Sequence, residues 1–364
     1  MKRTGLNFYL ILVIFIFSCG GRQYLMAPIS EDTVRKAEFL IVPVFYATDR
    51  NVTGLKAAEE YYGSIRGDDN LYRTGIVKVT IPKTHEEGQI EQAQWWKFWN
   101  NNDPGQYFTI QNIRELENKL FFETVKNQLS KAREGETFVF IHGFNNSFQE
   151  AAMRTAQIAY DLNYQGLPVM FSWPCKGGVS GYMTDEATIE WATPHLQAFL
   201  NDLIVKTRPK KINIIAHSMG NRALTAVLKN FSKANSQIIF NQIVLAAPDV
   251  DAAIFKRDIA PFLKTNANRV TMYCSSKDKA LIASKKVHTY IRAGESGKQI
   301  SLSKNIETVD ASLIDIDLIG HSYFNQSDLV LSDIRKLFEK NLPPTQRGLW
   351  LTRRNDNYYW MFRR

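Results

Sequence analysis

Ser218 stands in a sequence setting that favours nucleophilic chemistry. The string INIIAHSMGNRAL, residues 212–224, runs from an apolar, strand-like stretch directly into a helix-like one. A sharp turn between a strand and a helix lifts its middle side chain above the sheet, and small flanking residues let the backbone bend. The following helix directs its N-terminal amides and positive dipole end to the same place. A hydroxyl there is suited to attack, and the backbone N–H of Met219 can donate to a developing oxyanion.

This turn resembles the nucleophile elbow G-x-S-x-G of the α/β-hydrolase superfamily, with Ala216 in place of the first glycine. The strings VFYATDR, HGFNNSF, FSWP, AHSMGN, AAPDVD and GHSYF occur in that order within residues 39–340. As a set they are similar to a group of bacterial α/β-hydrolases of largely unassigned substrate. Cys175 departs from the small polar residue expected after FSWP. The resemblance implies a serine hydrolase of the esterase or lipase kind.

The resemblance also implies a second part of the site, the segment His142-Gly143-Phe144 at the end of another apolar run. In such hydrolases the backbone N–H after the His-Gly pair completes the oxyanion hole, which here implies the amides of Phe144 and Met219. Backbone amides suit this task because they are fixed before the reaction begins. We expect His142 itself to brace the loop through hydrogen bonds rather than to transfer protons.

A serine hydroxyl needs an imidazole to accept its proton, and a carboxylate to orient that imidazole. The superfamily order of serine, acid and histidine implies Ser218, Asp278 and His321. His288, the other histidine beyond Asp278, lies beside lysines, and we expect it at the surface. Asp249 is the alternative acid, and its competing interpretation is a helix cap.

The elements that must position these residues alternate between short apolar runs and amphipathic stretches of helical length. Consecutive apolar residues indicate strands buried on both faces, as in a parallel sheet covered by helices. The alternation predicts βαβ units in one α/β domain, doubly wound, with a mostly parallel sheet of about eight strands flanked by helices. The strands are expected at 39–50, 75–82, 137–144, 167–174, 211–218, 242–249, 269–276 and 311–320, and helices at 147–163, 187–207 and 221–233.

The N-terminus has the features of a secretory signal. Two basic residues precede an apolar run at 6–17, which at about a dozen residues is short for a membrane span. A small residue followed by Cys19 resembles a bacterial lipobox, which implies removal of residues 1–18 as a lipoprotein signal peptide and lipidation of the Cys19 thiol. An uncleaved signal anchor is the alternative. In either case we expect a bacterial envelope protein held at a membrane, with 19–38 as a tether.

Composition narrows the classes of function. The 364 residues carry 45 Lys and Arg against 36 Asp and Glu, and no nucleic-acid-binding motif accompanies the net charge of +9. We therefore expect no nucleic-acid partner. The sequence has no metal-binding Cys/His cluster and no phosphate-binding glycine loop, so we expect no metal and no cofactor. Three cysteines cannot build a disulfide-based fold, and we expect Cys175 and Cys274 to be free thiols on distant strands.

Together these residues predict a membrane-tethered serine hydrolase that cleaves small-molecule or lipid carboxylic esters through an acyl-serine intermediate, with its oligomeric state left open. Residues 39–340 are expected to form the hydrolase domain, and 341–364 a basic and aromatic tail. The alternatives are a phospholipase or thioesterase, and a non-catalytic envelope lipoprotein that uses the fold for binding. We expect the loop 175–188 to line the substrate pocket, because such folds bind ligands at the carboxyl ends of their strands.

Overall fold

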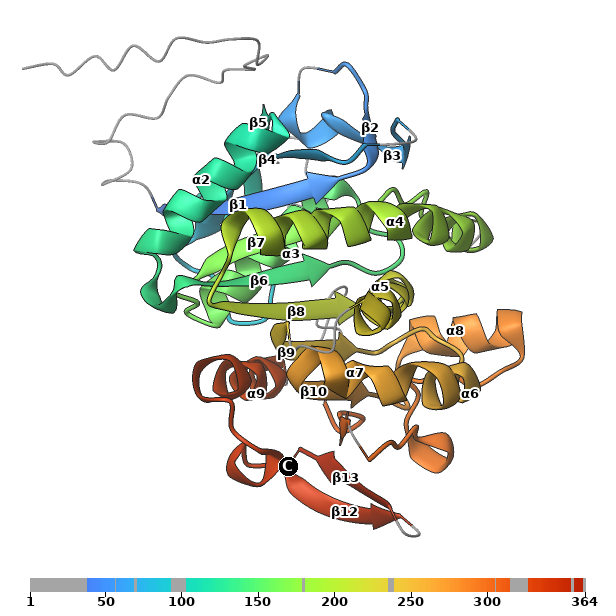
Figure 1. Ribbon diagram of the computed structural model, residues 1–364. Coiled ribbons are helices and arrows are strands. Elements are labelled where there is room, and N and C mark those ends of the chain that lie inside the picture. The colour runs from blue at the N-terminus through green and yellow to red at the C-terminus, as the bar shows by residue number, and fades with distance from the viewer. Residues whose placement is uncertain are drawn as a thin grey trace, which may run out of the picture.

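The framework of the protein is one large sheet, seen in a computed structural model that describes residues 38–55, 57–68, 71–92, 103–178, 181–234, 239–304, 306–314, 327–354 and 357–362. Its strands are β1 (Phe39–Thr48), β4 (Arg73–Pro82), β5 (Thr109–Leu116), β6 (Glu136–Ile141), β7 (Leu167–Ser172), β8 (Lys211–His217), β9 (Phe240–Ala246), β10 (Ala267–Cys274), β11 (Glu307–Asp310), β12 (Trp350–Arg354) and β13 (Asn357–Met361). The order across the sheet is β12-β13-β11-β10-β9-β8-β6-β7-β1-β4-β5 (Figure 1). A separate hairpin joins β2 (Arg50–Val52) to β3 (Tyr62–Arg66).

The pairing of the strands is mostly parallel. Every neighbouring pair from β13 across to β1 is parallel, whereas β1 with β4, β4 with β5, and β12 with β13 are antiparallel. This confirms the predicted α/β class and the mostly parallel sheet. The expected number of about eight strands is wrong, because the residues that the structure describes already give the sheet eleven. The unpredicted strands are β5 and the pair β12 and β13, which extend the two edges.

Helices cover both faces of the sheet. One face carries α2 (Asn118–Lys131), α4 (Tyr182–Thr207), α5 (Gly220–Ala234) and α7 (Ala260–Asn266), and the other carries α3 (Phe148–Asp161) and α9 (Ser327–Lys340). Two more, α6 (Ala252–Ile254) and α8 (Lys279–His288), lie at the end of the sheet toward which β6 and β8 point (Figure 1). Short 3₁₀ or π turns occur at Ala58–Glu60, Arg133–Gly135, Phe255–Ile259, Gly297–Gln299 and Pro344–Gln346.

The central strands are buried on both faces, which explains their unbroken apolar runs. In β6, Val139 and Ile141 pack with α2, α4 and α5, while Phe138 and Phe140 pack with α9. All four side chains are fully buried. A strand covered by helices on both sides has no solvent-facing side, so its apolar residues are consecutive rather than alternating.

The last of the eight predicted strands does not lie where its apolar pattern placed it. We expected it at 311–320, but β11 occupies Glu307–Asp310, and Ile314 N–H already closes a turn onto the Ala311 carbonyl. Residues 315–320 lie outside the described part of the chain. The reason is tertiary, because β11 is held between β10 and β13 and the Glu307 carboxylate pairs with Arg347 at 2.8 Å. Partners from other elements therefore select a segment that is poor in apolar residues.

The segment predicted as a tail, 341–364, contributes the hairpin β12–β13 to the sheet, and β13 pairs in parallel with β11. Its aromatic and basic residues therefore belong to a sheet edge in the described part. Within the described residues, no helix has both the length and the apolar character needed to cross a bilayer.

The two cysteines of the described chain are free and buried, as predicted. Cys175 follows β7 and Cys274 ends β10, with β6, β8 and β9 between those strands. Adjacent strands lie roughly 5 Å apart, so the two thiols are far beyond the reach of a disulfide.

Candidate active site

Ser218 occupies a strained turn between β8 and α5. Its φ is 47°, in the left-handed region that costs a non-glycine residue about 1–2 kcal/mol. Hydrogen bonds from several elements hold the turn in this conformation. Ser218 N–H donates to the Ala246 carbonyl at 2.9 Å, and the Asn221 amide donates to the carbonyls of Ala216 and Ser218, both at 3.1 Å. Sequence reasoning missed this role of Asn221, although the residue was part of the quoted string AHSMGN.

The turn packs directly against His142-Gly143-Phe144, which we call the oxyanion segment. A Cβ on Gly220 would lie 2.5 Å from the His142 carbonyl oxygen, so this position requires glycine. A Cβ on Gly143 would lie 2.9 Å from the Cβ of Ser218. The two glycines therefore allow two backbone segments from different strands to touch beside the serine, and the buried methyl of Ala216 fits where the family pattern has glycine.

His142 braces this segment, which confirms its predicted role. Its Nε2 accepts from Trp173 N–H at 3.0 Å, so Nδ1 carries the hydrogen and donates to the Gly143 carbonyl at 2.8 Å. The imidazole also stacks on the Trp173 ring, with centroids 5.1 Å apart. Burial, together with the nearby Arg50 guanidinium, holds the pKa of His142 well below its usual range. The ring is thus a neutral structural group.

Arg50 is a second brace, which sequence reasoning missed although the residue ends the quoted string VFYATDR. The side chain is 1% exposed, and its three nitrogens donate to neutral oxygens: Ser172 Oγ at 2.9 Å, Gly63 O at 3.2 Å and Asn146 O at 2.7 Å. No carboxylate lies within ion-pair distance of it in the described chain. Burial lowers the pKa of the guanidinium, but a group that starts so high remains charged at neutral pH. A buried cation therefore lies beneath the oxyanion segment.

The two predicted oxyanion donors lie on the touching segments. Met219 is fully buried and Phe144 is half-buried. Neither backbone N–H has a hydrogen-bond acceptor among the residues that the structure describes. An oxyanion hole requires backbone amides that have no acceptor within the protein and can donate to the substrate oxygen as it becomes negatively charged.

Asp278, the predicted acid, lies after β10 at the start of α8. It is the N-cap of this helix, and its Oδ1 accepts from Leu281 N–H at 2.9 Å. Because β8, β9 and β10 are adjacent and parallel, Asp278 and Ser218 follow strands that end at the same edge of the sheet (Figure 1).

Asp249, the alternative acid, has a different environment. It is 1% exposed, and its backbone N–H donates to the Ser218 carbonyl at 3.2 Å. Its carboxylate accepts from the hydroxyls of Tyr182 and Ser284, the latter at 2.6 Å, and pairs with Arg292 at 3.2 Å. The expectation that Asp249 caps a helix is wrong. The cap of α6 is Asp251, two residues further along, because only there does the chain turn into the helix.

The buried carboxylate belongs to a network that fixes α4 and α8 beside the serine turn. Arg222, from α5, donates to the Asp249 carbonyl at 2.8 Å and pairs with Glu186 of α4 at 2.5 Å. Glu186 also pairs with His288 Nε2 at 2.7 Å. The expected surface position of His288 is therefore wrong. Its ring is half-buried because the acidic partner that draws it inward comes from a helix a hundred residues earlier in the chain.

The loop that follows β7, within residues 175–188, lies beside the oxyanion segment. Asp185 accepts from the backbone N–H groups of Lys176 and Gly177, and Gly178 N–H donates to Asn145 Oδ1 at 3.0 Å. The Tyr182 ring packs edge-on against Phe144, with centroids 5.3 Å apart. This segment thus lies against the oxyanion segment, near enough to line a substrate site.

Two of the predicted functional residues lie outside the described residues. These are His321, in the chain after β11, and Cys19. The structure brings together Ser218, Phe144, Met219 and Asp249, and places Asp278 on the same edge of the sheet. The meeting of imidazole, hydroxyl and carboxylate therefore stays a prediction.

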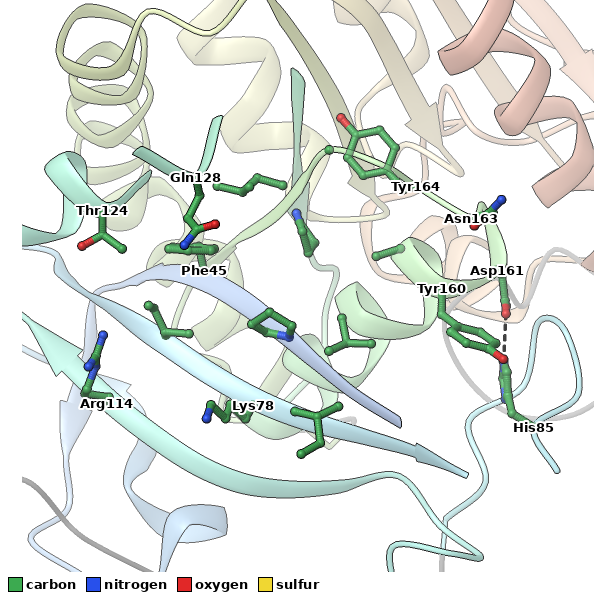
Figure 2. Close-up of a pocket in the computed structure, with 18 of the residues that line it drawn as sticks. Phe45, Lys78, His85, Arg114, Thr124, Gln128, Tyr160, Asp161, Asn163 and Tyr164 are labelled. Carbon is green, nitrogen blue, oxygen red and sulfur yellow. Dashed lines mark hydrogen bonds and ion pairs between the residues drawn. The ribbon is translucent and has the colours of Figure 1, made fainter. Parts of the chain in front are cut away.

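A large groove lies at the opposite ends of the strands. It measures about 860 Å³ and opens where β1 runs past the start of β7, because the two pair only from Phe45 onward. Figure 2 shows Lys78 and Arg114 on one side of it, and His85 bonded to Asp161 on the other. Of the predicted catalytic residues that the structure describes, none lines this groove.

Comparison with known families matches residues 118–339 to the family described as "Alpha/beta hydrolase of unknown function (DUF900)". This match covers more than half of the chain and runs from α2 to α9. Comparison with curated proteins gives no match.

Several solved structures resemble the chain at low identity. An uncharacterized protein from Bacillus cereus ATCC 10987 is 14% identical, with a TM-score of 0.37 over 58% of this chain and 61% of that one. The chain thus spans less than two thirds of the Bacillus protein. A proposed cell-surface hydrolase from Lactobacillus plantarum WCFS1 is 12% identical, with a TM-score of 0.37 over 59% and 96%. A Rhizomucor miehei esterase is 9% identical, with a TM-score of 0.31 over 85% and 88%.

Proposed function

The chain belongs to this family of α/β hydrolases, and we propose that it is a serine hydrolase that cleaves carboxylic esters through an acyl-serine intermediate. The observation that carries the proposal is the turn at Ser218. A serine held at φ 47° between a buried strand and a helix stands beside two backbone amides that have no acceptor in the described chain. Such an arrangement suits attack on a carbonyl and stabilisation of the oxyanion that forms.

In the proposed reaction, Ser218 Oγ attacks the ester carbonyl and His321 takes the hydroxyl proton. The carbonyl oxygen becomes an oxyanion that accepts from the amides of Phe144 and Met219. The C–O bond of the ester then breaks, and the alcohol leaves with the proton from His321. A water molecule, deprotonated by His321, next attacks the acyl-serine. The bond between the acyl carbon and Ser218 Oγ breaks, His321 returns the proton to Oγ, and the carboxylic acid is released. Asp278 orients His321 throughout.

A fluorophosphonate probe tests the nucleophile. We expect covalent labelling of the wild-type protein and of Ser130→Ala, a control in the exposed part of α2. We expect no labelling of Ser218→Ala, because only an activated serine reacts with this probe. If folded wild-type protein is not labelled, the non-catalytic binding protein is the better interpretation. Hydrolysis of phospholipid vesicles or thioesters in preference to short soluble esters would favour the phospholipase or thioesterase.

We also propose that the protein is tethered to a bacterial membrane through a lipidated Cys19. The support is the sequence alone, a short apolar run that ends at a small residue and a cysteine. Cys19→Ser should move the full-length protein from the membrane fraction to the soluble fraction or halt its processing. If Cys19→Ser stays in the membrane at unchanged size, the run at 6–17 acts as a signal anchor.

A further inference from the structure

A second, smaller cavity lies beside the oxyanion segment. It measures about 360 Å³ and is bounded by the β2–β3 hairpin, the first turn of α3 and the loop that follows β7. Most of the lining residues are polar, and we call this cavity the polar cleft. The lining residues used below are Arg50, Ser64, Asn145, Gln149, Cys175 and Lys176.

The polar cleft is close to the nucleophile. Cys175 lines it, and the Sγ of this residue lies 3.7 Å from the Gly143 carbonyl oxygen. A Cβ on Gly143 would in turn lie 2.9 Å from the Cβ of Ser218. With ordinary bond lengths between those atoms, the wall of the cleft is within on the order of 10 Å of the serine. This sum follows the atoms one by one and is therefore an upper limit, so the straight distance that the alcohol portion of an ester has to cover is shorter.

The chemistry of the cleft favours a ligand with several hydrogen-bonding groups. The side chains of Ser64, Gln149 and Lys176 have no hydrogen-bond or ion-pair partner within the described chain. Beneath them lies the buried Arg50 guanidinium, which has only neutral acceptors. Hydroxyl groups both donate and accept, so they can satisfy an amide, a hydroxyl and an ammonium in one cleft.

The other side of the oxyanion segment is aromatic. Phe144 turns its ring toward Tyr182, and the ring of Tyr182 also packs against His288, with centroids 5.8 Å apart. An ester has two sides, and only one of them departs while the other stays bound to the serine. An open, polar cleft allows the alcohol to leave and the water to enter. The acyl group, which stays bound to the serine, is better held against an apolar surface.

We propose that the polar cleft binds the alcohol portion of the ester and that this alcohol carries several hydroxyl groups, as a glycerol ester does. The inference rests on the proposed serine hydrolase activity and names the substrate class of that same site.

Two acetate esters that share an acyl group test this proposal. Release of acetic acid is measured from glycerol monoacetate and from ethyl acetate, with wild-type protein and with Gln149→Leu and Lys176→Met. The matched control is Gln128→Leu, the same substitution as at residue 149 but in the remote groove. We expect wild type to favour the glycerol ester at least tenfold in kcat/KM. Each cleft variant should lower that ratio three- to tenfold, the effect of about one hydrogen bond, with ethyl acetate changed less than twofold.

These outcomes distinguish the proposed alcohol site from the serine hydrolase activity on which it rests. If the protein is labelled at Ser218 but the ratio is near one, or if the cleft variants leave it unchanged, the polar cleft is not the alcohol site and the hydrolase proposal stands. If wild type is neither labelled nor able to cleave either ester, both proposals are overturned. Lys176 is exposed, so Lys176→Met provides the result even if Gln149→Leu fails to fold.

Discussion

His142 and His217, at the carboxyl ends of the parallel strands, differ in charge from His85 at the opposite ends. Beside the serine turn, His142 is buried and His217 is half-buried, and desolvation lowers the pKa of His217 to about 3 and that of His142 well below its usual range. At the opposite ends, His85 lies between Asp161 at 2.8 Å and Glu91 at 2.9 Å. Burial opposes its charge, but hydrogen bonds to the two carboxylates prevail and raise the pKa of His85 to about 9.

This difference shows how each edge is held together. A neutral imidazole can brace a loop without a counter-ion, as His142 does beside the two amides that have no acceptor in the described chain. A carboxylate there would repel a developing oxyanion. At the other edge no charge develops, and a charged histidine can pin the loop of residues 83–92 to the end of α3. We therefore expect the contacts of His85 to affect stability without affecting catalysis.

The largest effect is expected from the two candidate acids. Asp278→Asn should lower kcat by about 10,000-fold, because the amide holds the wrong imidazole tautomer. Its melting temperature should change little, since Asn caps a helix as well as Asp. Asp249→Asn should instead lower the free energy of unfolding by about 3 kcal/mol, because it leaves Arg292 without its buried counter-charge. A folded, inactive Asp249→Asn beside an active Asp278→Asn would reverse this assignment.

A smaller effect is expected at the opposite edge. His85→Ala should lower the free energy of unfolding by about 3 kcal/mol at pH 7, because the buried Asp161 and the half-buried Glu91 lose their shared cationic partner. Its kcat on a short ester should stay within about threefold of wild type, since His85 lies at the far ends of the strands. Urea unfolding and ester hydrolysis of the same preparation provide the two values. Loss of activity in a fully folded variant would contradict the separation of the edges.

The same histidine predicts a dependence on pH. Its folded pKa of about 9 lies above the unfolded value near 6.5, so its stabilisation is complete below about pH 6.5 and is lost as the pH rises through 9. The difference in unfolding free energy between wild type and His85→Ala should therefore shrink from pH 6 to pH 10. A difference that grows over this range would show that His85 is neutral when folded.

The smallest effect is expected from relieving the backbone strain at Ser218. Ser218→Gly should raise the free energy of unfolding by about 1 kcal/mol while abolishing activity, because glycine adopts φ 47° without strain. Ser218→Ala is the matched control, since it removes the hydroxyl but keeps the Cβ, and its stability should stay near that of wild type. Equal stabilities for all three proteins would mean that the turn stores no strain.

Local patterns were sufficient where one segment determines its own structure. The run before Ser218 and the small residues around it predicted β8, the turn and α5, because burial and tight turning leave marks in consecutive residues. The brace at His142 was predicted for the same reason. Strand β11 was misplaced because its position depends on β10, on β13 and on the pairing of Glu307 with Arg347.

Partners that are distant in sequence explain the other misses. Asp249 meets Tyr182, Ser284 and Arg292, and no spacing in the chain indicates that these four groups share a buried cluster. Arg50 is another example, because its acceptors come from β3, from the end of β7 and from Asn146, just after the oxyanion segment. Such networks are products of the topology, so a sequence pattern cannot predict them.

The pairing of β13 with β11 has a consequence for biosynthesis. β11 lies between β10 and β13, and β13 leaves the ribosome after every other strand in the described sheet. A nascent chain that has released β11 therefore has only one neighbour for it, and this short strand gains its second only when β13 emerges. We expect the stretch bearing His321, which follows β11, to acquire its final setting late, after the Ser218 turn has formed.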